Sequence, residues 1–212
     1  MPSSVAAILR AAVRERRNIV ICGGTGSGKT TLLNGLAALV APEDRLVVIE
    51  DTAELHIGHA NHLRLEARRQ QGEVPAVTMR DLLRATLRHR PDRIIVGEVR
   101  GGEPFDLLQA MNTGHSGSLA TIHANSAVLA LNRMTTCVLM ADVGLPFGAI
   151  RSQIAESVNL VVHIDRAPGG TRLVTEIVGV AGYDPEGDRF NFVTQFKRKE
   201  HESGAATEID PE

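Results

Sequence analysis

A glycine-rich stretch at residues 23–30 constrains this chain more than any other feature of its sequence. It reads Gly-Gly-Thr-Gly-Ser-Gly-Lys-Thr, it follows an apolar run at residues 18–22, and a helix-forming run begins at residue 31. Strand, glycine-rich turn and helix in this order form a phosphate loop, in which backbone N–H groups and the helix N-terminus hold phosphate oxygens. A flexible Gly/Ser loop is the alternative, but the flanking strand and helix argue against it. The sequence therefore predicts nucleotide binding.

The residue types of the loop fit this chemistry. Lys29 can reach the β- and γ-phosphates, and the Thr30 hydroxyl can bind Mg²⁺. The glycines let the backbone curl so that its N–H groups point at the ligand. ATP or ADP with Mg²⁺ is the expected ligand set, and the expected nucleotide-binding residues are Gly24, Thr25, Gly26, Ser27, Gly28, Lys29, Thr30 and Thr31.

Composition sets the limits on class and partners. The 212 residues suffice for one α/β domain, with or without a small appendage. A net charge of -2 gives no general attraction to nucleic acid, and an aromatic content of 3% without tryptophan argues against base stacking, so no base-specific nucleic-acid binding is expected. Cys22 and Cys137 are far apart and are expected to be core residues of a protein in a reducing compartment. No signal peptide or membrane-spanning run is visible, so any link to a membrane must come through partners.

Short apolar runs alternate with helical patterns along most of the chain. Buried strands are expected at residues 46–49, 93–96, 118–122 and 160–164, with helices between them. Alternating residues at 172–178 and 190–194 predict antiparallel edge strands. The fold class expected is α/β, a mostly parallel sheet flanked by helices. Residues 56–77 are expected to be loop, and the histidines within it are better explained as solvated side chains than as metal ligands: His56, His59 and His62.

Three side chains are expected to join the phosphate loop at one edge of this sheet. Glu50, Glu98 and His123 each follow a predicted strand. Because the carboxyl ends of parallel strands meet at the same edge, and ligands of such sheets bind there, these residues should lie beside the phosphates. That convergence says more about function than any single motif.

Four motifs in a fixed order resemble those of the type II and type IV secretion ATPases, hexameric motors related to RecA. They are a Walker A motif at 23–30, an acidic box at 48–55, a Walker B motif at 94–100 and a histidine box at 113–126. Residues 87–101 look most like TrbB-type conjugal-transfer ATPases, and Tad-pilus and type II secretion motors are close relatives. The resemblance implies a RecA-like P-loop fold and Mg²⁺-dependent ATP hydrolysis. It also implies a homohexamer in the full-length protein, held at the cytoplasmic side of the inner membrane by secretion or conjugation machinery.

The resemblance also assigns roles to residues. Lys29 would bind phosphate, Glu50 would position or deprotonate the attacking water, and Glu98 would hold Mg²⁺ with Thr30; the two glutamates could exchange roles. His123 would sense the γ-phosphate or couple it to movement, and Arg100 would stabilise charge within or between subunits. His115 is a weaker candidate from the same histidine box.

Two departures from the family pattern matter. Gly97 stands where an ordinary Walker B strand ends in Asp, so Glu98 must supply the acid. Family members also carry an N-terminal domain, whereas here the phosphate loop begins at residue 23, so the chain is expected to be a motor domain. Its expected parts are a leading helix or linker at 1–17, the RecA-like ATPase domain at 18–198 and a polar, disordered tail at 199–212. A P-loop kinase or a DNA-translocating RecA relative is the alternative, and the four motifs favour the secretion motor.

Overall fold

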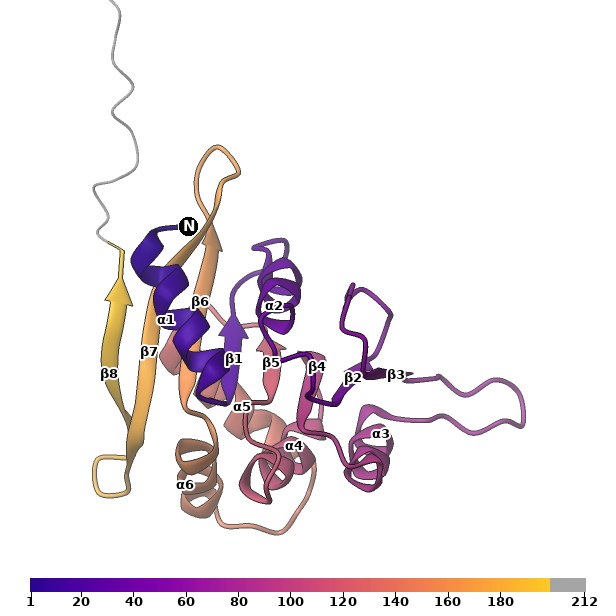
Figure 1. Ribbon diagram of the computed structural model, residues 1–212. Helices are drawn as coiled ribbons and strands as arrows, with labels where there is room; N and C mark the ends of the chain where they lie inside the picture. Colours follow the sequence, from indigo (N-terminus) through magenta and orange to yellow (C-terminus); the bar gives the residue numbers. More distant parts are fainter. Residues whose placement is uncertain (199–212) are drawn as a thin grey trace, which may run out of the picture.

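An eight-stranded sheet forms the centre of the computed structural model, which describes residues 1–198 (Figure 1). The strands follow one another across the sheet in the order β3-β2-β4-β5-β1-β6-β7-β8. They are β1 (Ile19–Cys22), β2 (Leu46–Glu50), β3 (His62–Glu66), β4 (Arg93–Val99), β5 (Leu119–Ile122), β6 (Leu160–Arg166), β7 (Arg172–Asp184) and β8 (Arg189–Lys197). The helices are α1 (Ser3–Arg14), α2 (Lys29–Ala37), α3 (Met79–Thr86), α4 (Glu103–Asn112), α5 (Ala127–Met140) and α6 (Phe147–Ser157), with a short 3₁₀ turn at Leu87–His89.

The predicted fold class is confirmed by the pairing of the strands. Every neighbouring pair from β3 to β6 is parallel, whereas β6–β7 and β7–β8 are antiparallel. Helices separate the parallel strands along the chain, except that β3 follows β2 through a segment without a helix. The strands β7 and β8 form one edge of the sheet. Their alternating sequence had predicted antiparallel edge strands.

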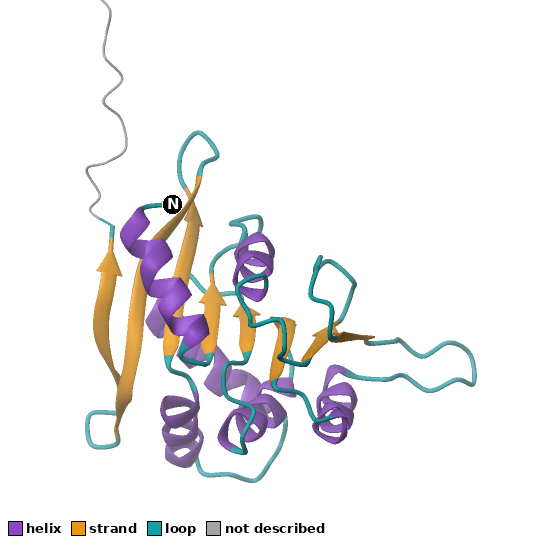
Figure 2. Ribbon diagram, in the orientation of Figure 1, coloured by secondary structure: helices purple, strands orange, loops and turns teal. Residues whose placement is uncertain are grey.

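Apolar side chains on both faces of the sheet explain why helices cover both faces (Figure 2). Successive strand residues point to opposite faces. In β1, Val20 and Cys22 pack with α3 to α6, whereas Ile19 and Ile21 pack with α1 and α2. A strand buried on both sides must be apolar at every position, which is why the central strands appear in the sequence as continuous apolar runs.

The edge strand β3 was missed by the sequence analysis, which assigned residues 56–77 to a loop. Only alternate residues of β3 are partly buried, since the strand lies at the edge and pairs with β2 alone. Its outward positions are polar, so no continuous apolar run marks it. The segment that follows projects from the body as an arm, held by isolated bridges between Arg68 and Val77 and between Gln71 and Val74 (Figure 1).

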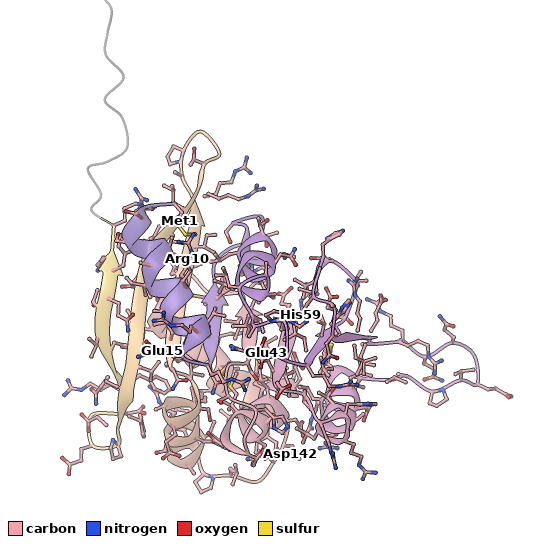
Figure 3. The ribbon with its side chains drawn as sticks, in the orientation of Figure 1. Met1, Arg10, Glu15, Glu43, His59 and Asp142 are labelled. Atoms are coloured by element: carbon pink, nitrogen blue, oxygen red, sulfur yellow. The ribbon has the colours of Figure 1, made fainter. Side chains whose placement is uncertain are left out.

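Helix α1 belongs to the packed body of the protein. Val5, Leu9 and Val13 are buried in the same cluster as α2 and β1, while Arg10 and Glu15 are exposed on its outer side (Figure 3). The boundary between a leading helix at 1–17 and a motor domain at 18–198 remains a proposal. The predicted tail at 199–212 lies outside the described residues.

Asn18 joins the amino ends of three adjacent strands. Its buried side chain donates from Nδ2 to the Ser157 carbonyl at 2.7 Å, and its Oδ1 accepts the N–H groups of Gly117 and Ser118 at 2.8 and 3.0 Å. Its own N–H donates to Asn159 Oδ1 at 2.8 Å. One amide therefore satisfies backbone groups that lead into β5 and β6 beside β1.

We expect Asn18→Ala to lower the free energy of unfolding by about 2–4 kcal/mol, because three buried backbone groups lose their partners. Urea denaturation followed by circular dichroism measures this change. Asn191→Ala is the matched control: that asparagine is exposed on β8, so its removal should change stability by no more than about 0.5 kcal/mol. Equal effects of the two substitutions would contradict the structural role of Asn18.

Candidate active site

A cavity of about 210 Å³ lies at the carboxyl edge of the parallel strands. The phosphate loop, the ends of β2, β4 and β5, and the segment after β2 form its walls. The convergence predicted from the sequence is therefore present: the lining residues are Thr25, Gly26, Lys29, Thr30, Glu50, Asp51, Thr52, Glu54, Leu55, Gly97, Glu98, Arg100, Thr121 and His123.

The phosphate loop presents backbone donors that have no acceptor in the described chain. No backbone oxygen in residues 1–198 accepts the N–H groups of Gly26, Gly28, Lys29 or Thr30. Gly26 and Gly28 have φ of 71° and 99°, the left-handed region that turns successive N–H groups toward one point. Ser27 Oγ is buried and also lacks a partner. A polyphosphate supplies the acceptors that this loop lacks, so the loop fits a nucleotide.

The Lys29 ammonium lies within this loop. Its side chain is largely buried, and Nζ donates to the carbonyl oxygens of Gly23 and Gly24 at 3.1 and 2.9 Å. Nζ is also 3.4 Å from His123 Nδ1. Burial lowers the pKa of Lys29, and the carboxylate of Glu98 opposes that shift. The ammonium is thus held at the mouth of the loop, on the side of the strands that carry the acidic residues.

Glu98, His123 and Arg100 form one charged group beside Lys29. Glu98 Oε1 lies 2.8 Å from His123 Nε2, and Glu98 Oε2 accepts from Arg100 Nη2 at 2.5 Å. The carboxylate of Glu98 raises the pKa of Arg100. Burial lowers the pKa of His123 below its ordinary value, although Glu98 acts in the opposite direction. Burial therefore disfavours the imidazolium form of His123.

Glu50 lies in the same wall, but both of its oxygens are already bound. Oε1 accepts the N–H groups of Glu54 and Leu55 at 2.9 and 2.8 Å. Oε2 receives Arg64 Nε at 2.9 Å and Nη2 at 2.6 Å. The Glu50 side chain is only 2% exposed, so in this conformation it braces the acidic box and has no oxygen free for water.

The unusual glycine at position 97 has a steric reason. A Cβ atom on residue 97 would lie 3.0 Å from Glu50 Cγ, closer than nearly all real Cβ contacts. The Gly97 carbonyl also accepts the Thr121 hydroxyl at 2.6 Å, which ties β4 to β5 at the floor of the cavity. A larger residue at position 97 would therefore require the Glu50 side chain to shift.

Not every candidate from the sequence lines the cavity. His115 lies after α4, where its Nδ1 is 3.2 Å from the Ala110 carbonyl. Thr31 is exposed on the first turn of α2 and is also absent from the lining. In the loop before β3, His59 Nε2 lies 3.0 Å from the Ala41 carbonyl. Within residues 1–198, no three potential metal ligands lie close enough together to hold an ion.

The sequence analysis missed two arginines that contact the site. Arg64 holds Glu50 from the edge strand β3, where it is in register with Val48 of β2. Recognising it required the strand itself, whose alternating pattern was the only signal. Arg172, at the start of β7, donates from Nε to the Gly26 carbonyl at 3.2 Å. No motif marks Arg172, because only the fold of the β6–β7 hairpin brings it to the loop.

Comparison with known proteins places this geometry in a family. Residues 1–176 match the family described as "Type II/IV secretion system protein". The chain belongs to this family. It is 45% identical over 186 residues to the conjugal transfer protein TrbB of Rhizobium radiobacter, covering 86% of this chain and 54% of that protein. It is 43% identical over 165 residues to the type IV secretion system protein PtlH of Bordetella pertussis, covering 76% and 49%.

Solved structures agree with this assignment. The VirB11 ATPase of the Brucella suis type IV secretion system, solved in complex with sulphate, superposes with a TM-score of 0.74 at 38% identity, over 87% of this chain and 53% of that one. The pilus retraction motor PilT with bound ADP superposes with a TM-score of 0.56 at 24% identity, which supports the fold alone. The RecA-like class is thereby confirmed.

The chain spans about half the length of the curated relatives it matches. None of the helices in residues 1–198 is long and apolar enough to cross a membrane.

We expect His123 to titrate below its ordinary value and to be neutral at pH 7, because burial disfavours the imidazolium. Glu98→Gln should lower the pKa of His123 further, since the Glu98 carboxylate favours the protonated ring. NMR titration of the imidazole signals in the wild-type and variant chains measures both shifts. A pKa above the ordinary value would show that burial does not govern this histidine, and a pKa that rises in Glu98→Gln would show that the Glu98 carboxylate does not favour the protonated ring.

Proposed function

We propose that this chain is the ATP-hydrolysing part of a motor that powers assembly or substrate transfer in a bacterial conjugation or type IV secretion apparatus. One observation carries the proposal: free phosphate-loop donors, Lys29, Glu98 and His123 meet in a single cavity at the carboxyl edge of the sheet. Relatives named for conjugal transfer and type IV secretion support the biological setting. A Tad-pilus or type II secretion motor is the closest alternative.

Binding follows from the geometry of the loop. The backbone N–H groups of residues 26–30 would surround the β-phosphate, and Lys29 Nζ would exchange its two carbonyl acceptors for phosphate oxygens. Thr30 and Glu98 both line the cavity and would hold Mg²⁺, which neutralises phosphate charge when bound. Arg100 would add positive charge from the same wall, within one subunit or toward a neighbour.

Hydrolysis needs a base for the attacking water, and the contacts favour Glu98 over Glu50. The Glu98 side chain is 20% exposed and has one partner on each oxygen, His123 and Arg100, whereas Glu50 is 2% exposed and has two donors on each oxygen. We therefore propose that Glu98 orients and deprotonates water while it also contacts the metal. Neutral His123 would contact the γ-phosphate, and Glu50 would keep the acidic box in place; Glu50 replaces Glu98 as the base only if the Arg64 contact opens.

The assembly proposal rests on the family. We propose a homohexamer for the full-length protein, docked on secretion or conjugation components at the cytoplasmic side of the inner membrane. A kinase is the weaker candidate, because Arg64, at the start of the segment that would serve as its lid, is already bound to Glu50. A DNA-translocating motor is separated from the secretion motor by its response to DNA.

Lys29→Ala tests the proposed activity directly. We expect ATP turnover to fall to background, because the variant loses the cation that binds the transferred phosphate, while the circular dichroism spectrum stays unchanged. Lys197→Ala is the control. Lys197 is exposed on β8 and does not line the cavity, so this variant should keep wild-type turnover. Phosphate release is measured with and without DNA, together with native mass. Normal turnover of Lys29→Ala would overturn the proposed function, and strong stimulation by DNA would favour the translocase.

The two glutamates are separated by substitution with glutamine. Glu98→Gln should still bind ATP but hydrolyse it at least about a hundredfold more slowly, the scale of a lost general base. Glu50→Gln should lower the melting temperature as well as turnover, because Arg64 loses the charge it pairs with. Single-turnover hydrolysis, nucleotide binding and thermal unfolding distinguish them. If Glu98→Gln only raises the Mg²⁺ requirement while Glu50→Gln stops hydrolysis at unchanged stability, Glu50 is the base.

A further inference from the structure

The phosphate loop has two sides, and the structure gives them different chemistry. On one side of β1 lies β5, followed by β4, and these strands carry His123 and Glu98. Lys29 Nζ points to this side, since it lies 3.4 Å from His123 Nδ1. Because Lys29 binds the β- and γ-phosphates, the terminal phosphate belongs here. A nucleoside that continues from the diphosphate away from Lys29 would extend over the other side of β1, toward β6.

On that second side, the strand β6 and the β6–β7 hairpin press against the loop. A Cβ atom on Gly23 would lie 2.2 Å from the Ile164 carbonyl oxygen, so the β6 backbone touches the beginning of the loop. The hairpin then brings back Arg172, whose Nε donates to the Gly26 carbonyl at 3.2 Å. A Cβ atom on Gly28 would lie 2.7 Å from Arg172 Cδ, so the side chain packs directly on the loop backbone.

These contacts hold the Arg172 side chain but involve only one of the nitrogen atoms of its guanidinium group. The residue is exposed, and its two Nη atoms have no hydrogen-bond partner among residues 1–198. The Nε bond and the contact of its methylene groups with Gly28 place the side chain against the loop. A planar, weakly hydrated cation with free donors stacks on an aromatic base and donates to ribose hydroxyls.

We propose that Arg172 is the residue of this chain against which the nucleoside rests, with its guanidinium plane on the base and its free donors toward the ribose. This inference deepens the proposed function and rests on it. It assigns the antiparallel extension of the sheet a part in nucleotide binding, whereas the parallel strands serve the phosphates. Arg172 is thus a binding residue for the nucleoside and not a catalytic one.

ADP and pyrophosphate form the matched pair of ligands for the test, because they share the diphosphate and differ by the nucleoside. Isothermal titration calorimetry on the 212-residue chain gives both dissociation constants. Arg172→Ala should weaken ADP binding about tenfold, the scale of a cation–π contact, and leave pyrophosphate binding within about twofold. Arg172→Lys should not restore ADP binding, since an ammonium keeps the charge but lacks the plane.

Arg166→Ala is the control variant. Arg166 pairs with Arg172 across the same hairpin but makes no hydrogen bond to the phosphate loop. Its removal tests for a general effect of positive charge and should leave both ligands unchanged. Thermal unfolding of each variant shows whether the hairpin itself is disturbed.

The remaining outcomes separate this inference from the proposed function. Equal losses of ADP and pyrophosphate in Arg172→Ala would mean that Arg172 only braces the loop, and recovery by Arg172→Lys would mean that it acts by charge. Unchanged ADP binding in Arg172→Ala would also overturn the inference, while tight binding by the wild-type chain would leave the nucleotide site standing. A wild-type chain that binds neither ligand would overturn the nucleotide site and the inference together.

Discussion

Four backbone N–H groups of the phosphate loop, those of Gly26, Gly28, Lys29 and Thr30, have no backbone acceptor within residues 1–198, and the neighbouring elements must hold the loop despite this deficit. Such a loop is costly unless a ligand supplies the missing oxygens. It is also built on glycines with positive φ, which gain nothing from local propensity. Rigid neighbours must therefore hold it in shape. The strand β1 precedes the loop and is buried at every position. The helix α2 follows the loop and packs on the core through its buried residues.

The buried carboxylate of Glu50 determines the path of the chain along one side of the cavity. Glu50 is almost fully buried, and a buried carboxylate is tolerated only when its oxygens are satisfied. Two backbone N–H groups and Arg64 meet this requirement, and together they fix the path of residues 51–55 along the cavity. Arg64 lies on β3 at the edge of the sheet, and its side chain is 39% exposed. A molecule that contacts Arg64 there would therefore also affect Glu50, which lines the nucleotide cavity.

The sequence predicted what is local and repeated, and it failed where the structure depends on distant contacts. Continuous apolar runs identified the central strands at residues 46–49, 93–96, 118–122 and 160–164, which the structure shows as β2, β4, β5 and β6. By contrast, β3 carries only an alternating edge pattern.

The same contrast holds for the site. Lys29, Glu98 and His123 were predicted to meet because motif order and strand polarity fix their positions. The bound state of Glu50 could not be predicted, since it depends on an arginine fourteen residues away that sits on the missed strand. Arg172 is 146 residues from its acceptor Gly26, so only the three-dimensional path of the hairpin reveals their contact.

The order of the strands also explains how residues on opposite sides of the phosphate loop could contact the phosphates and the nucleoside of one ligand. With β1 between β5 and β6, the loop lies over the middle of the sheet, and each neighbouring strand delivers its own residues to one side of it. The parallel neighbours end at the site and can present only the residues that follow them, such as His123 after β5. On the other side, the chain turns back as β7, so the hairpin reaches over the loop and returns Arg172 to it. A strand parallel to β6 in the place of β7 would begin at the opposite edge of the sheet, so its first residue would lie far from the loop. The change from parallel to antiparallel pairing between β6 and β7 is therefore what brings Arg172, the first residue of β7, to the side of the phosphate loop where we place the nucleoside.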